Sequence, residues 1–430
     1  MVPRFSTQEY ANRYKKVRQQ MKRQGIDCIV VPNSENIFYL TNVNFLYFGA
    51  YLVFPLEDEP ALFVSDVLFA PQEKVGQTPS KIGRYWGGEH TTTVKLSSII
   101  DDIRSVPAET FPSVIAECLA RLGVEKGKIG IAGADVTVTV MTQNVIGYGL
   151  VGDVGPEGLN HGFYQELKRR LPLANFVDAT GILAEVRRTK SDEEIVSVKS
   201  ACEIADQAAF EIQDKIRSGI REDELFATYW HSILSKGGRN RWFMALTTQT
   251  SNPTDFGGHI QPYDYVLREG DIFIGELVPV SRDGYAGHVD QSLVLGEPRK
   301  EIYSKLNEVC IEAFNAVSKS LRPGARSEEV CRAGDGPIAD AGLIRAAPLA
   351  YSMGLWGAEP PFVGAAADPY SGREKEIPLQ KGMVIAVVSH VYDKTTLAAL
   401  RIGATYLITE GGSQRLTTYP VDPALKAIDR

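Results

Sequence analysis

Residues 186–206 read VRRTKSDEEIVSVKSACEIAD, and this stretch marks the start of a second structural unit. Ser191 is followed three residues later by Glu194, which is the spacing of a capping box. In that arrangement each of the two side chains satisfies a free amide of the first helical turn. Apolar residues then recur at helical spacing from Ile195 to Ala205. The stretch therefore predicts a long amphipathic helix with a well-defined first turn.

The rest of the second half repeats one order of elements. Helical patterns are followed by strand patterns rich in β-branched residues, and the same order then returns. The segments concerned are helices at 221–236, 299–320 and 327–340 and strands at 271–280, 285–296, 383–388 and 405–409. We expect an internal duplication of element order over residues 186–430, without a residue-level repeat.

The first half alternates helical and strand patterns. The expected helices are 7–25, 110–123 and 161–171, and the expected strands are 28–32, 51–55, 61–64 and 128–133. Alternation of this kind is typical of helices packed on a sheet. We therefore predict an α/β domain over residues 1–185.

The composition excludes several classes of protein. The 430 residues are enough for two or three domains. The formal charge of −7 argues against a nucleic-acid binder and against attraction to a membrane. The sequence contains neither an apolar run long enough to span a membrane nor a secretory signal. The five cysteines form no C-x-x-C pair, so we expect reduced thiols and a cytoplasmic protein.

Several catalytic signatures are missing from the sequence. It has neither a G-x-x-x-x-G-K-[ST] loop nor a G-x-G-x-x-G after a strand, and it lacks H-E-x-x-H and G-x-S-x-G. Only six histidines are present. Nucleotide binding therefore has no support in the sequence, and we expect no cofactor.

The second half nevertheless resembles the catalytic domain of the creatinase, aminopeptidase P and prolidase superfamily. The matching segments are 186–206, REGDIFIGELVPV (268–280), DGYAGHVDQSLVLG (283–296), GLWGAEPP (354–361), KGMVIAVV (381–388) and LRIGATYLITEGG (400–412). The resemblance implies an α+β "pita-bread" domain with an internal pseudo-duplication at 186–430. It also implies a creatinase-like N-terminal α/β domain at 1–185.

The peptidases of this superfamily hold two metal ions with two aspartates, one histidine and two glutamates. Those positions align here with Glu276, His288, Tyr351, Val388 and Gly403. Because valine and glycine offer no side-chain ligand, both bridging glutamates are lost, and we expect no metal. A single ion held by Glu276 and His288 is the alternative.

Creatinase is the relative that works without metal, and it uses a histidine as a proton shuttle. The residue of this sequence that matches the creatinase histidine is His259, eleven residues before Gly270. The glutamate on the second strand of creatinase matches Asp290. The resemblance therefore implies His259 as the catalytic acid and base. His288 and Asp290 lie two residues apart on an expected strand, so their side chains face the same side and would share in catalysis.

The resemblance also implies a set of residues that bind the substrate. The resemblance further implies a homodimer in which each active site is shared between the two subunits, and Phe48 would contribute to the active site of the partner subunit. The predicted substrate-binding residues are Glu276, Glu359, Tyr285, Tyr351, His390, Arg401 and Phe48.

From these residues we predict a metal-independent, creatinase-like hydrolase of a C–N bond. Its substrate would be a small polar molecule with a cationic amine, amidine or guanidine-like group, which carboxylates can bind directionally. One alternative is a lyase or isomerase in which the same histidine abstracts a proton. Another is a non-catalytic pita-bread module that binds peptides or proteins.

Overall fold

The computed structural model describes residues 4–43, 50–65, 99–132, 161–248, 262–355, 357–364 and 377–428. The chain divides into two compact units, and the boundary lies between Arg187 and Arg188. Each unit is considered by itself below. Among the described helices, none is both long enough and apolar enough to cross a membrane.

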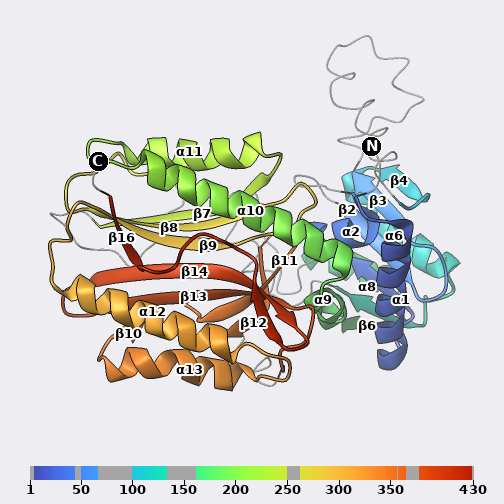
Figure 1. Cartoon of the computed structure of the whole chain (residues 1–430). Helices are drawn as coiled ribbons and strands as arrows, with labels where there is room; N and C mark the ends of the chain where they lie inside the picture. Colours follow the sequence, from blue (N-terminus) through green and yellow to red (C-terminus); the bar gives the residue numbers. More distant parts are fainter. Residues whose placement is uncertain are drawn as a thin grey trace, which may run out of the picture. The chain divides into compact units, whose positions relative to one another are not determined.

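The described strands of the first unit form one six-stranded sheet in the order β4-β3-β2-β1-β5-β6 (Figure 1). The central strand β1 pairs antiparallel with β2 and parallel with β5. The strands are β1 (Cys28–Val31), β2 (Ala50–Pro55), β3 (Ala61–Ser65), β4 (Ile103–Val106), β5 (Lys128–Ile131) and β6 (Asn175–Asp178). The helices are α1 (Thr7–Gln24), α2 (Ser34–Thr41), α6 (Phe111–Arg121), α8 (His161–Arg170) and α9 (Thr180–Arg188), with the 3-10 turn η2 (Ala108–Thr110) before α6.

The ends of α1 illustrate how local sequence sets the elements of this unit. The Ser6 side chain accepts a hydrogen bond from the amide of Glu9 and caps the first turn. Gly25 follows the last turn with a φ of 63°, a left-handed conformation that glycine adopts without strain. The chain then enters β1, whose four residues are all buried.

The described strands of the second unit form one ten-stranded sheet. The main order is β12-β11-β13-β14-β9-β8-β7, with β10 on β13, β15 on β14 and β16 on β9. The strands are β7 (Arg239–Thr248), β8 (Ile272–Val280), β9 (Val289–Leu295), β10 (Ile344–Arg345), β11 (Ala350–Gly354), β12 (Gly357–Val363), β13 (Val384–Asp393), β14 (Ala398–Thr409), β15 (Gly412–Arg415) and β16 (Leu425–Ile428). The helices are α10 (Asp192–Lys215), α11 (Glu222–Ser235), α12 (Ile302–Ser320) and α13 (Ser327–Asp340).

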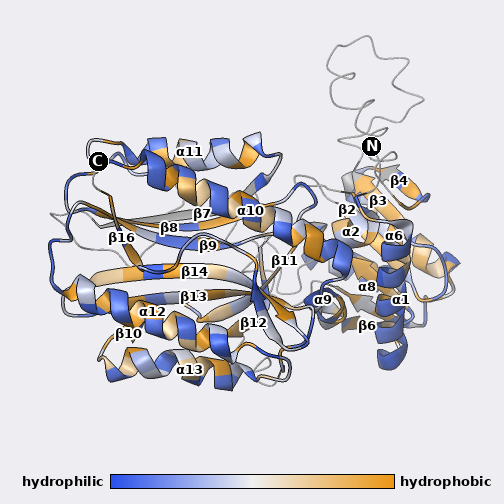
Figure 2. Ribbon diagram, viewed as in Figure 1, coloured by the Kyte–Doolittle hydropathy of each residue, from blue (hydrophilic) through white to orange (hydrophobic). Residues whose placement is uncertain are grey.

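The duplication of element order is present in this unit. Helices α10 and α11 precede β7, β8 and β9, and α12 and α13 precede β10 to β14. In Figure 1 the pair α10 and α11 is drawn above the curved strands, and the pair α12 and α13 is drawn below them. Figure 2 shows hydrophobic and hydrophilic residues alternating along α12 and α13, as expected for helices with one face on the core. The fold expected from the resemblance is therefore confirmed.

Two cores fix which face of the sheet carries polar residues. Phe273, Leu277 and Val289 pack with α10 and α11, and Val387 and Ile402 pack with α12 and α13. Because neighbouring residues in a strand point to opposite faces, Glu276, Asp290, Val388 and Gly403 lie on the other face. The helices thus set the position of the polar face through the register of the strands.

Three strands differ from the prediction by several residues at one end. Strand β9 begins at Val289 rather than at residue 285, β13 ends at Asp393 rather than at 388, and β14 begins at Ala398 rather than at 405. The prediction for β14 is too short because Arg401 and Gly403 interrupt its apolar pattern. Its ten paired residues with β13 nevertheless hold the whole segment in the sheet.

Candidate functional site

Strand pairing brings residues that are far apart in the sequence to one face of the sheet. Glu276 of β8 lies opposite Asp290 of β9, and Asp290 lies opposite Gly403 of β14. Gly403 lies opposite Val388 of β13, and Tyr351 of β11 pairs with the other edge of that strand. Residues opposite each other on paired strands share a face. The register therefore gathers the predicted site positions in one place.

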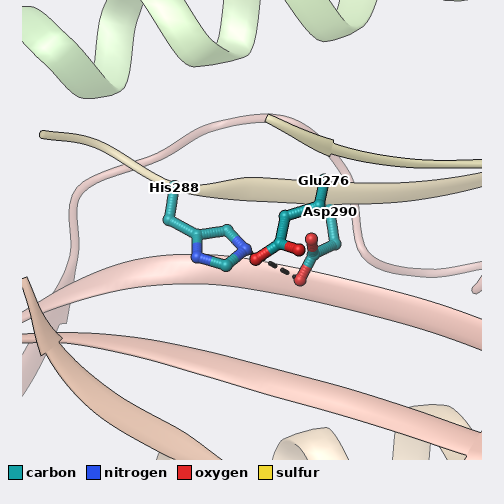
Figure 3. Close-up of side chains that lie close together, drawn as sticks. All are labelled: Glu276, His288 and Asp290. Carbon is teal, nitrogen blue, oxygen red and sulfur yellow. Dashed lines mark ion pairs between the residues drawn. The ribbon is translucent and has the colours of Figure 1, made fainter. Parts of the chain in front are cut away.

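Figure 3 shows that the side chains of Glu276, His288 and Asp290 converge. His288 Nε2 lies 2.8 Å from Asp290 Oδ2, and both side chains are fully buried. His288 directly precedes β9, yet its side chain is on the same side as that of Asp290, as the spacing of two residues predicts.

The backbone of His288 is held from two directions. At Gly287 an added Cβ would lie 2.6 Å from the amide nitrogen of Cys202 in α10, so only glycine allows this approach to the helix. Thr405 Oγ1 accepts a hydrogen bond from the His288 amide at 2.9 Å and donates one to its carbonyl at 3.0 Å. These contacts fix the point from which the imidazole projects.

Arg401 of β14 contacts both acidic groups. Its Nη2 lies 2.8 Å from Glu276 Oε1, and its Nε lies 3.1 Å from Asp290 Oδ1. The contacts to Asp290 from Arg401 and His288 have ion-pair distances, but their angles fall outside those of hydrogen bonds. Charge attraction is therefore the main force that holds the Asp290 carboxylate.

Tyr351 closes the group on the other side. Its hydroxyl lies 2.7 Å from His288 Nδ1 and 3.3 Å from Glu276 Oε1. If Nδ1 carries no proton, the hydroxyl donates to it; if Nδ1 carries one, the hydroxyl accepts it and donates to Glu276. The Tyr351 hydroxyl thus connects His288 to Glu276 through contacts at hydrogen-bond distance.

The charges of this group follow from its burial and its neighbours. Burial opposes ionisation of Asp290, but Arg401 and His288 hold the pKa of Asp290 below its usual value. Burial, with the nearby Glu276 carboxylate, raises the pKa of Tyr351 well above 10. The Tyr351 hydroxyl is therefore neutral at physiological pH and can act as a hydrogen-bond donor.

His390 of β13 lies beside this group, opposite Arg401 in the strand register. Burial, reinforced by the Arg401 charge, lowers the pKa of His390 to about 3. Its imidazole is therefore neutral at physiological pH. In the part of the chain that the structure describes, Nε2 of this buried ring has no hydrogen-bond partner.

Two other predicted substrate-binding residues, Glu359 and Tyr285, contact residues outside this group. Glu359 of β12 forms a buried ion pair with Lys190, whose Nζ lies 3.1 Å from Glu359 Oε2. The Tyr285 hydroxyl donates to Glu194, which also completes the capping box of α10. A role of Glu359 and Tyr285 in binding substrate stays a prediction.

The predicted proton shuttle His259 and the predicted partner-site residue Phe48 lie outside the described residues. Their roles stay predictions. The sequence interpretation also missed Thr405 as a support for His288, since nothing in a sequence marks a hydroxyl that reaches a residue 117 positions away. Arg401 was expected to bind substrate, and its contact with both carboxylates could have been found only from the β9–β14 register.

The comparisons with known proteins agree with this architecture. Residues 13–144 match the Creatinase/Prolidase N-terminal domain, and residues 197–410 match Metallopeptidase family M24. A Xaa-Pro dipeptidase of Pyrococcus horikoshii is 28% identical over 264 residues, which are 60% of this chain and 71% of that protein. A putative dipeptidase of Bacillus subtilis is 24% identical over 96% of this chain and 99% of its own.

Solved structures show the same fold along almost the whole chain. The structure of a Xaa-Pro dipeptidase from Bacillus anthracis has a TM-score of 0.74 at 18% identity and covers 97% of this chain and 100% of its own. The prolidase of Pyrococcus horikoshii has a TM-score of 0.72 at 21% identity, with 96% and 99% covered.

The family description names metallopeptidases, so the residues present can be compared with the needs of two metal ions. Val388 and Gly403 carry no ligand atom. Ligand atoms of Glu276, His288 and Asp290 lie within 4.8 Å of one another, but Arg401 already contacts both carboxylates. The described residues therefore do not fit a dinuclear metal centre.

The comparisons correct the predicted reaction. We predicted hydrolysis of a non-peptide C–N bond in a small cationic molecule, and this prediction is wrong, because the matching relatives are named as dipeptidases. The sequence interpretation relied on the creatinase branch at two positions, and it gave too little weight to the rest of the chain. The broader prediction of a hydrolase agrees with the names of these relatives.

Three observations agree with one another. Two family models match the two halves of the chain, the helix–helix–strand order is duplicated, and solved structures match along almost the whole chain. The chain belongs to the creatinase, aminopeptidase P and prolidase superfamily, with a pita-bread domain in its second half.

Proposed function

We propose that this chain hydrolyses the amide bond of a small peptide at the edge of the group formed by Glu276, His288, Asp290, Tyr351 and Arg401, here called the buried cluster. The observation that supports this most directly is that a carboxylate, which can accept a proton, lies next to a neutral hydroxyl, which can donate a hydrogen bond. Glu276 and the Tyr351 hydroxyl lie side by side there. The names of the relatives, among them Xaa-Pro dipeptidases, supply the substrate class.

Burial indicates which members of the buried cluster can meet a substrate. His288 and Asp290 are fully buried, whereas Glu276 and Tyr351 each keep 8% of their surface exposed. A peptide would therefore contact Glu276 and Tyr351. His288 and Asp290 would act behind them, through Tyr351.

Glu276 and Tyr351, which keep a small exposed surface, suit the two halves of amide hydrolysis. Arg401 and Tyr351 both contact Glu276 Oε1, which leaves Oε2 to accept a proton from an attacking water. The water oxygen bonds to the carbonyl carbon, and the Tyr351 hydroxyl donates a hydrogen bond to the carbonyl oxygen as negative charge develops. The C–N bond then breaks, and the Glu276 carboxyl gives its proton to the leaving nitrogen.

His288 and Asp290 have a supporting part in this scheme. Asp290 orients the imidazole through Nε2, and Nδ1 meets the Tyr351 hydroxyl. The ring can therefore hold the hydroxyl in the direction of the carbonyl oxygen. Positioning residues of this kind affect the reaction through the group that they orient.

The experiment is product analysis with the purified full chain in water enriched in heavy oxygen. The substrates are dipeptides ending in proline and the matched dipeptides ending in alanine. The proposal predicts free amino acids and one heavy oxygen in the new carboxylate, as measured by mass spectrometry. Peptide binding in a calorimeter without release of amino acids, or products without the label, would contradict the proposal.

A further inference from the structure

A buried ion pair joins the segment before helix α10 to the hairpin of β11 and β12. Lys190 Nζ lies 3.1 Å from Glu359 Oε2, and the two side chains are only 1% and 10% exposed. The other carboxylate oxygen, Oε1, accepts a hydrogen bond from the Leu355 amide at 3.2 Å. Both oxygens of this carboxylate therefore have partners within the protein. Since taking two charges out of water is costly, the place of this pair in the fold needs a reason.

The Glu359 carboxylate holds the point at which β11 turns toward β12. It lies so close to Gly354 that an added Cβ at this glycine would collide with it. Lys190 is fixed in turn, because its amide donates a hydrogen bond at 2.8 Å to the carbonyl of Gly382, just before β13. The ion pair thus ties the end of β11 to the start of α10 and of β13.

The corner at Gly354 is connected to two residues of the buried cluster. Tyr351 lies three residues before it on β11. The Gly354 carbonyl also accepts a hydrogen bond from the Ala286 amide at 3.0 Å, and His288 follows two residues later. The Tyr351 hydroxyl and His288 Nδ1 meet at 2.7 Å. The backbones that carry these two side chains are therefore joined at the corner that Glu359 holds.

A β-bulge beside Tyr351 affects the direction of its side chain. Ser352 pairs with Glu359 of β12. Its neighbour Tyr351 pairs with Phe362, so the two prolines between these partners are extra residues in β12. Bulges of this kind change the direction of side chains next to them. The Tyr351 ring lies beside Phe362, with ring centroids 6.1 Å apart. The bulge begins directly after the residue that the ion pair fixes.

The strand register places the Glu359 carboxylate on the face away from the Tyr351 side chain. Its partner Ser352 directly follows Tyr351 on β11, and neighbouring residues in a strand point to opposite faces. Gly354, against which the carboxylate packs, lies on the Ser352 face. The ion pair can therefore affect the reaction through the placement of Tyr351.

We propose that the Lys190–Glu359 ion pair is a positioning device for the Tyr351 hydroxyl. By fixing the corner at Gly354, it holds this hydroxyl at His288 Nδ1. Lys190 and Glu359 are then positioning residues that act without touching the substrate. The effect on catalysis rests on the proposed peptide hydrolysis, because it requires the part that Tyr351 has there. The effect on the contact between Tyr351 and His288 is independent of that proposal.

The test removes both charges together, because a single buried charge without its partner would destabilise the fold. The full-length variant Lys190→Met/Glu359→Met is compared with K190M/E359Q, whose glutamine keeps an acceptor for the Leu355 amide. We expect kcat for the dipeptide cleaved best to fall about 10–100-fold in K190M/E359M, with a small change in KM, and to fall less in K190M/E359Q. The control R345M/D335N removes an ion pair of 2.7 Å in the same unit and should keep wild-type kinetics.

A double-mutant cycle with Tyr351→Phe separates positioning from a general structural effect. If the ion pair acts through the Tyr351 hydroxyl, K190M/E359M should lower kcat by less than about twofold in the Y351F background. Equal losses of kcat in the wild-type and Y351F backgrounds would overturn the inference.

Crystal structures of the same variants test the placement without any activity. We expect the Tyr351 hydroxyl of K190M/E359M to lie beyond hydrogen-bond distance of His288 Nδ1, and R345M/D335N to keep the contact. An unchanged contact in K190M/E359M would overturn the inference, whereas a wild type that cleaves no peptide would contradict only the proposed function. If K190M/E359M does not fold, the same measurements on K190M/E359Q decide, and failure of both variants to fold counts against the inference.

Discussion

At Tyr351 a single oxygen atom connects the fully buried His288 to the Glu276 carboxylate. Its hydroxyl contacts His288 Nδ1 and Glu276 Oε1, and its raised pKa keeps it protonated. If it stabilises the developing oxyanion, its loss should act on the chemical step more than on binding.

We therefore expect Tyr351→Phe to lower kcat for peptide hydrolysis about 10²–10³-fold with a small change in KM. The measurement is steady-state kinetics on the dipeptide found to be cleaved best. The matched control is Tyr406→Phe. Tyr406 lies in the hydrophobic core between the sheet and helices α12 and α13, so this variant should keep wild-type kinetics. Equal kinetics for Y351F and the wild type would remove Tyr351 from the mechanism.

His390 gives the second prediction at this scale, and it concerns pH. Its folded-state pKa is about 3, below the ordinary value of 6.5, so the unfolded chain binds a proton more readily between these values. The contribution of a neutral His390 to stability is therefore present above pH 6.5 and is lost as the pH falls toward about 3.

His390→Gln removes this titration. We expect the free energy of unfolding, measured by urea titration, to fall less steeply with decreasing pH in the variant. The difference in slope should approach about 1.4 kcal/mol per pH unit within the window. Identical slopes for wild type and variant would show that the pKa of His390 is the same in the folded and the unfolded protein, and would contradict the lowered value.

Among the elements, β14 approaches β9 more closely than a side chain at position 403 would allow. Gly403→Ala should push the Asp290 carboxylate away, since the added Cβ would lie 2.1 Å from Oδ2. We expect a loss of about 1–3 kcal/mol in the free energy of unfolding. The control is Gly336→Ala in α13, where an added Cβ meets nothing within 4 Å. Equal stability of G403A and the wild type would contradict the close packing of the two strands.

The first turn of α10 gives a prediction that depends on the capping box. Ser191 accepts from the Glu194 amide at 3.2 Å, and Glu194 accepts from the Ser191 amide at 2.7 Å. We expect Ser191→Ala to lower the free energy of unfolding by about 1 kcal/mol in chemical denaturation. Ser218→Ala, at an exposed position in the turn after α10, should have no effect. A loss of the same size in S218A would show that the cap is not the cause.

The elements also show how far the sequence could predict this structure. The capping box and the apolar periodicity predict α10, because both are local signals. The contact between Arg401 and Asp290 depends on strands more than a hundred residues apart, so no local pattern contains it. The family register placed Glu276, His288 and Asp290 on one face, but it could not show that an arginine contacts both carboxylates.

For the whole molecule, no metal should contribute to the stability of the fold. The two units have their own hydrophobic cores, and Arg401 pairs with both carboxylates of the buried cluster. We expect dialysis against a chelator to leave the thermal unfolding temperature unchanged in calorimetry. A fall of several degrees, restored by a divalent ion, would indicate a bound metal that stabilises the native state.

The homodimer expected from the resemblance stays a prediction at this scale. Sedimentation velocity at several protein concentrations tests it directly. We expect the mass of two chains, and a single-chain mass at all concentrations would contradict it.

The central claim is that the buried cluster, without side-chain ligands at Val388 and Gly403, holds no pair of metal ions, and that Arg401 contacts both of its carboxylates. The most direct measurement is X-ray diffraction from crystals soaked in Mn²⁺, with anomalous data collected near the manganese edge. We predict electron density for the Arg401 guanidinium against both carboxylates and no anomalous peak between them. Anomalous peaks that bridge Glu276 and Asp290, with Arg401 turned away, would contradict the account.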